Sequence, residues 1–343
     1  MSTRSPKGSR TFPLGARGFS RAAGFVLIAL WAIAALVAPV LAPHAIDDRF
    51  GNFPNAPPTR PHVIDDRGGV HLPFIYRVVL VNRLEQTYEQ QRYARVPLAW
   101  FRGGRVVTSA DDSDTPLLVL GADSYGRDVF SRLLYGARIS LALALVSALG
   151  AMVLGGAIGG LAGYTGGALD DALMRATDLV MVLPGMYVVL ALRAVLPPVL
   201  EPGLVFVLLA LIFAIVGAPF IARGVRAIVR AERALDYASA AQALGAGGVR
   251  LLVRHLLQAA RGFIAFEITL LVPAFIFAEA TLSYVGLGFP ESIASWGTML
   301  HDASTNVRVF ADFPWLLSPA AAMFLVVLGL NLALEGKRTD VVM

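Results

Sequence analysis

Six long apolar runs, separated by polar stretches, dominate the pattern of this chain. Each run has about twenty residues, enough for a helix to cross a bilayer core of roughly 30 Å. The runs cover residues 22–42, 139–163, 172–196, 204–222, 263–285 and 315–334. They predict an all-α polytopic membrane protein with six transmembrane helices. Pro184-Gly185 interrupts the third run and predicts a kink there, which serves either helix packing or gating.

A polar segment, residues 43–119, separates the first two runs. It carries mixed charge and several prolines, a composition that must lie outside lipid. Residues 96–102 and 105–109 flank Gly103-Gly104, a turn signal that predicts a β-hairpin. We therefore expect a small extracytoplasmic insert between transmembrane helices 1 and 2. It is either a passive loop or a functional element, which is a cap over the translocation path or a contact for a solute-binding partner, and the sequence leaves these interpretations open.

The start of the second run has an amphipathic pattern. Asp128 and Arg132 share one face of a predicted helix, and apolar residues line the other face. We expect a short helix at the outer membrane interface with an i, i+4 ion pair between these two residues. Further along, Gly155, Gly159 and Gly163 follow GxxxG spacing, which predicts that another helix packs closely against this span.

Composition supports a membrane protein. The 343 residues are 56% hydrophobic and only 15% charged, against about 25% charged in soluble domains. Residues 1–21 contain five basic residues and no acid, and loop 223–261 contains seven arginines against two acids. Because basic residues favour the cytoplasmic side, we expect a multi-pass inner (plasma) membrane protein with both termini in the cytoplasm: 1–21 is a cytoplasmic tail and 22–42 is transmembrane helix 1.

A cleaved secretory signal is an alternative interpretation of the first run. Val40-Leu41-Ala42 resembles a cleavage site, but the run is longer than a typical signal core of about 7 to 15 residues, and Pro43 follows directly. An uncleaved anchor fits better.

Motifs for catalysis are missing from the sequence. The chain has no cysteine, its five histidines stand singly, and Gly336-Lys337-Arg338 cannot be a Walker A loop because Asn331 replaces its first glycine and Arg338 its Ser or Thr. We expect no catalytic, cofactor or metal site and no nucleic-acid partner. An ion-coupled secondary transporter remains an alternative, although ionisable residues such as Glu267 and Glu279 lie toward the ends of their span.

Residues 236–258, in the loop after the fourth run, have a pattern of their own. Ala240, Ala241 and Leu244 give a small, helix-favouring surface, and Gly245 begins a glycine-rich turn. A second helix follows, with apolar residues at Val249, Leu252, Val253 and Leu256. A helix–turn–helix held against the membrane face is predicted, either as a docking surface for another protein or as an ordinary interfacial hairpin.

This segment resembles the EAA loop of ABC importer permeases. Ala240, Ala241 and Gly245 match that pattern, whereas Ser239 stands in place of its Glu and Gln258 in place of its Pro. LGADSYGRDVFSRLLYGARISL (120–141) and EATLSYVGLGFPESIASWGTML (279–300) are similar to the C-type permease partner of dipeptide, oligopeptide and nickel importers.

The resemblance implies a type I ABC importer permease whose core, residues 120–343, holds transmembrane helices 2–6 and the cytoplasmic coupling loop 223–261. Its implied partners are a second, homologous permease subunit, cytoplasmic ATP-binding subunits and an extracytoplasmic solute-binding protein. ATP is hydrolysed by the separate subunits, and the cargo is a peptide or a similar small solute. The implied ATPase-docking residues are Asp236, Ser239, Ala240, Ala241, Leu244 and Gly245.

Overall fold

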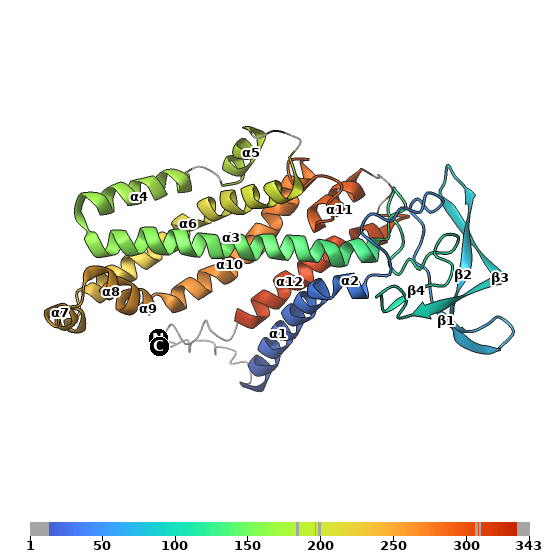
Figure 1. The fold of residues 1–343 in the computed structure, drawn as a ribbon, viewed down its shortest axis with the longest axis horizontal. Helices are drawn as coiled ribbons and strands as arrows, with labels where there is room; N and C mark the ends of the chain where they lie inside the picture. Colours follow the sequence, from blue (N-terminus) through green and yellow to red (C-terminus); the bar gives the residue numbers. More distant parts are fainter. Residues whose placement is uncertain are drawn as a thin grey trace, which may run out of the picture.

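A bundle of long helices carries a β-sheet at one end and a short helical hairpin at the other in the computed structural model (Figure 1). The structure describes residues 14–182, 185–195, 197, 200–305, 308 and 310–334. Pro184 and the Walker-like residues 336–338 lie outside these ranges.

Five of the described helical segments are long and apolar enough to cross a membrane. They are α1 (Leu14–Leu36, apolar from Phe19), α3 (Val129–Thr165), α6 (Pro202–Arg233), α10 (Arg261–Tyr284) and the segment Pro314–Leu334, which contains α12 (Ser318–Leu334). In place of the third predicted span lie two shorter helices, α4 (Gly167–Val182) and α5 (Gly185–Val195). The prediction of a mainly helical, polytopic membrane protein is confirmed, and the count of six crossings stays a prediction.

The predicted close packing at the GxxxG positions is present, and its partner is α6 of the same chain. A Cβ added at Gly155, Gly159 or Gly163 would lie 2.5, 2.2 or 2.7 Å from a backbone oxygen of α6. Real Cβ atoms do not approach so closely, so only glycine fits at these positions. Small residues let the backbones of two membrane helices approach closely. The two helices then gain dispersion contacts with each other along their whole length.

Two further contacts complete the bundle. A Cβ at Gly24 of α1 would lie 2.5 Å from the backbone nitrogen of Ala333, so α1 and α12 also touch through their backbones. Phe213 of α6 stacks on Phe275 of α10 with a centroid distance of 5.4 Å. The core therefore lies where α3, α6 and α10 meet, and α1 with α12 flanks it (Figure 1).

The start of α3 corrects two expectations. There is no separate interfacial helix, because α3 is one continuous helix of 37 residues. Asp128 and Arg132 do not pair: Asp128 is the N-cap and accepts hydrogen bonds from the backbone N–H groups of Phe130 and Ser131. Both charged residues are buried. The polar face at the start of α3 therefore contacts other charged groups of the chain and not water.

The segment between α2 (Ala38–Leu41) and α3 contains a four-stranded antiparallel sheet. Its strands, in sheet order, are β1 (His62–Ile64), β2 (Val70–Asn82), β3 (Thr87–Trp100) and β4 (Val107–Ser109). The predicted hairpin is present between β3 and β4, and Gly103 and Gly104 adopt the positive φ angles, +61° and +77°, that such a turn requires. The longer β2–β3 hairpin was not predicted.

Candidate docking surface

Helix α6 positions the candidate loop. It continues to Arg233, well past the end of its apolar run, and the chain then forms α7 (Asp236–Ala243) and α8 (Gly248–Leu251). A single π-helical turn (Leu252–Leu256) and α9 (Leu257–Ala259) lead into α10. Gly245 turns the chain between the two helices with a φ of +87°, a conformation that side-chain-bearing residues rarely adopt. The predicted helix–turn–helix is thus the observed local structure.

Contacts with the ends of α3 and α6 hold this loop in place. Ala238, Leu251 and Leu256 are fully buried against the bundle. Tyr164, at the end of α3, packs so closely on Gly248 that a Cβ there would lie 2.6 Å from its hydroxyl. The guanidinium of Arg233 lies over the same tyrosine ring, 4.8 Å from its centroid. The loop is therefore packed directly against α3 and α6.

The six candidate docking residues divide into two groups. Asp236, Ser239, Ala240, Leu244 and Gly245 are exposed. They lie in or directly after α7, the helix that is farthest from the sheet (Figure 1). Ala241 is half-buried and packs against the hydrophobic core, so its methyl group supports α7 rather than standing free. Leu244 is 89% exposed, which leaves a large apolar side chain in water. A single exposed leucine is common on protein surfaces, so Leu244 gains weight here only from its place beside Ala240 on a loop whose base packs against the bundle.

A buried carboxylate joins three helices at the other end of the bundle. Glu279 of α10 is fully buried and accepts hydrogen bonds from the hydroxyls of Ser140 on α3 (3.0 Å), Ser283 (2.8 Å) and Ser295 (2.7 Å). Ser295 in turn caps α11 (Trp296–Ser304), accepting a hydrogen bond from the Thr298 N–H. Glu279 therefore fixes the start of α11 against α3 and α10.

A second buried cluster surrounds Arg127, just before α3. Its guanidinium donates to Asp123 at 2.6 Å, to Asp302 of α11 at 2.7 Å and to Glu291 at 3.3 Å. Burial alone would lower the pKa of Arg127, but the three carboxylates outweigh it and raise that pKa above its usual value. Arg132 lies 3.7 Å from Asp123 and 3.6 Å from Asp302. These charges tie α11 to the start of α3.

His44 occupies a third buried polar site, beside the N-cap of α3. Its Nδ1 lies 3.2 Å from Asp128, and its Nε2 lies 3.6 Å from Asp112. Burial by itself lowers the pKa of His44, but the two carboxylates outweigh it and raise the pKa to about 9. The sequence does not reveal these three polar sites, because most of their partners lie far apart in the chain; the local signals are Ser283, four residues after Glu279, and Asp123, four residues before Arg127.

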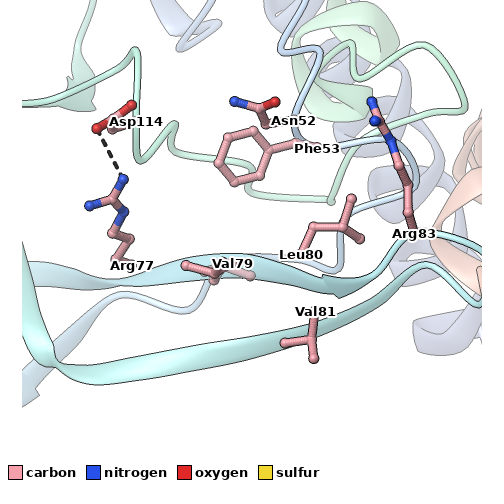
Figure 2. Close-up of a pocket in the computed structure, with 9 residues that line it drawn as sticks. Asn52, Phe53, Arg77, Val79, Leu80, Val81, Arg83 and Asp114 are labelled. Atoms are coloured by element: carbon pink, nitrogen blue, oxygen red, sulfur yellow. Dashed lines mark hydrogen bonds and ion pairs between the residues drawn. The ribbon is translucent and has the colours of Figure 1, made fainter.

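An open cleft of about 360 Å³ lies in the β-sheet region. Figure 2 shows Arg77 and Asp114 joined across one end of it, at 3.0 Å, with Arg83 at the other end. Its lining comes from β2, residues 52–53, Arg83 and Asp114, without any residue of the membrane-spanning helices. The cleft therefore belongs to the sheet region alone.

Comparisons with known proteins cover most of the bundle. Residues 155–336, more than half of the chain, match the family model described as binding-protein-dependent transport system inner membrane component. The chain is 38% identical over 219 residues to the oligopeptide transport system permease protein OppC of Bacillus subtilis, which is 64% of this chain and 69% of that protein. It is 35% identical to the glutathione transport system permease protein GsiD of Pectobacterium atrosepticum, over 64% of this chain and 70% of that protein.

The similarity to a third relative covers more of the chain. The dipeptide transport system permease protein DppC of Haemophilus influenzae is 30% identical over 277 residues, which cover 78% of this chain and 88% of that protein. The similarity to transport permeases therefore reaches well beyond the segment that matches the family model.

Proposed function

The chain belongs to the family of binding-protein-dependent transport system inner membrane components, and we propose that it lines the pore through which an ATP-driven importer passes peptides. As a member of that family it is a multi-pass permease subunit of the inner membrane and not an enzyme. The similarity to permeases of oligopeptide, dipeptide and glutathione transport supports a peptide cargo. The relatives do not support the alternative of an ion-coupled secondary transporter.

The orientation in the membrane is part of this proposal. The seven arginines against two acids in the loop 223–261 support a cytoplasmic position for it, and the sheet lies at the opposite end of the bundle (Figure 1). Residues 43–119 then form an extracytoplasmic insert that can face a solute-binding protein. Both termini lie in the cytoplasm in this orientation, because α1 begins and α12 ends away from the sheet. A second, homologous permease subunit completes the pore.

The tip of α7 is the proposed docking surface for a cytoplasmic ATP-binding subunit. The observation that carries this proposal is the exposure of Leu244 beside the small surface of Ala240, on a loop whose base is packed against α3 and α6. Burying Leu244 in a cleft of a partner removes apolar surface from water, worth roughly 1.5–3 kcal/mol for a complete leucine side chain. The rigid base of the loop can pass movement of that partner to the helices.

Leu244→Asp tests the docking proposal, and Leu84→Asp is the matched control. Leu84 is 94% exposed at the turn between β2 and β3, so the same substitution there adds the same charge at the far end of the molecule. We expect Leu244→Asp to release the ATP-binding subunits and abolish uptake, since a charge buried without a partner typically costs several kcal/mol. The control should retain the ATP-binding subunits, because Leu84 lies at the opposite end of the molecule from α7 (Figure 1).

The measurement is co-purification of the ATP-binding subunits beside peptide uptake in the same cells. Retention of both by Leu244→Asp would remove this surface from the mechanism. The more conservative Ser239→Ala should be mild, because Ser239 stands where the family pattern has a carboxylate and cannot supply its charge.

A further inference from the structure

The turn between β3 and β4 exposes two large aromatic side chains. Trp100 is 53% exposed and Phe101 is 80% exposed, and Arg102 beside them is also exposed. We call residues 100–105, Trp-Phe-Arg-Gly-Gly-Arg, the aromatic tip. A polar segment gains nothing from showing two neighbouring aromatic rings to water, so the exposure itself points to a missing apolar environment.

Two hydrogen bonds hold the aromatic tip at the end of the first span. The backbone N–H of Val106 donates to the carbonyl oxygen of Val40 at 2.8 Å, and the guanidinium of Arg105 donates to the carbonyl oxygen of Pro43 at 2.5 Å. Val40 belongs to α2, the short helix that continues α1. Because the apolar run of α1 and α2 ends at residue 42, these bonds place the tip at the height where the span leaves the hydrocarbon core.

The end of that span next to the tip has exposed apolar side chains. Leu36, Val37 and Val40 are all exposed, so α1 and α2 still present apolar side chains where the chain contacts the tip. Tryptophan is enriched at both interfaces of a membrane, where its ring lies at the level of the headgroups. Arg102 and Arg105, together with Asp112, also line an open cleft of about 400 Å³ beside the turn.

We propose that the aromatic tip inserts into the headgroup layer of the bilayer beside the first span. Trp100 and Phe101 then lie against the boundary with the acyl chains, and Arg102 lies among the lipid phosphates. The sheet is thereby attached to the membrane through its own side chains in addition to its connections to α2 and α3. The proposal depends only on the first span crossing the membrane, and it is independent of cargo and of orientation.

The absence of cysteine from the chain permits a direct test. A spin label at Phe101→Cys, in the full chain reconstituted in phospholipid vesicles, reports its surroundings through collisions with oxygen, which concentrates in lipid, and with a water-soluble nickel chelate. Leu84→Cys, in the other exposed turn of the sheet, is the control. We expect a several-fold higher ratio of oxygen to nickel collisions at Phe101 than at Leu84. Phe101 has a left-handed backbone, with a φ of +55°, which a substitution could disturb. Trp100→Cys avoids this position and should give the same result as Phe101→Cys.

Two outcomes would overturn the proposal. Nickel collisions at Phe101 as frequent as those at Leu84 would show that the tip lies in water. Few collisions with both reagents would show that protein covers it, for example a second copy of this chain. Neither outcome touches the transport proposal, because depth in the membrane is measured without transport.

Discussion

Gly159→Ala is expected to destabilise the protein although it adds only one methyl group. The new Cβ would lie 2.2 Å from the backbone oxygen of Ala222 and 2.9 Å from the Cα of the same residue. Ordinary contact begins at 3.4 Å, so α6 would have to move by about 1.2 Å, and a helix backbone cannot rotate out of the way as a side chain can. Overpacking of this kind typically costs about 1–3 kcal/mol.

Gly156→Ala is the matched control, because it lies one turn away on the same helix and its added Cβ would meet nothing within 4 Å. The effect of replacing glycine with alanine on helix propensity, about 1 kcal/mol, is common to both variants and cancels in their comparison. The assay is thermal unfolding of the full chain in one detergent. For a chain of 343 residues, a cost of 1–3 kcal/mol corresponds to a midpoint lower by roughly 1–4 °C. Equal midpoints for the two variants would refute the helix contact described above.

Three further predictions concern other parts of the molecule. A reporter fused after Asp111 should be extracytoplasmic and one fused after Arg233 cytoplasmic; a cytoplasmic reporter at Asp111 would contradict six crossings. The pKa of His44 is raised to about 9 in the folded chain, above its unfolded value of about 6.5. Its stabilising contribution is thus complete below pH 6.5 and is lost as the pH rises to 9. The melting temperature of the native chain should fall across this window more than that of His44→Gln, and parallel curves would argue against a charged histidine. Glu279→Ala, which leaves three buried hydroxyls without their acceptor, should lower the melting temperature more than Glu279→Gln; an equal loss would mean that the hydroxyls find other partners.

Most of the helical bundle could be predicted from the sequence, because each span depends on a local property. An apolar run of sufficient length must be helical in lipid, and glycines at a spacing of four must lie on one face of that helix. Gly103-Gly104 and Gly245 were equally informative, since both mark turns that need positive φ angles. In each case the few residues that determine the local structure are neighbours in the chain.

The buried charges could not be predicted in the same way. Asp128 and Arg132 have the spacing of an exposed helical ion pair, and only the contacts of Arg132 with Asp123 and Asp302 explain its burial. Asp302 lies 170 residues away along the chain, so no local pattern contains it. The β2–β3 hairpin was missed for a related reason. Most of β3 is exposed or half-exposed on both faces, which removes the alternation by which a strand is recognised.

The candidate docking surface could be predicted from the sequence only in part. The sequence predicted its helices and its turn, and the exposure of Leu244 agrees with an interaction site. The sequence did not predict that Ala240 is exposed and Ala241 half-buried. The angle between α6 and α7 decides which of these two methyl groups faces the bundle. Whether an ATP-binding subunit docks there stays a prediction.

The length of α3 has a mechanical consequence. At 1.5 Å per residue, its 37 residues form a rod about 55 Å long, against a bilayer core of about 30 Å. One end is held by Tyr164 against the loop that follows α6, and the other begins beside the charges around Arg127. A tilt of about 5° about one end displaces the other by roughly 5 Å over that length. A small rotation imposed at the loop therefore reaches the far side as a displacement of about one side chain, without any change within the helix itself.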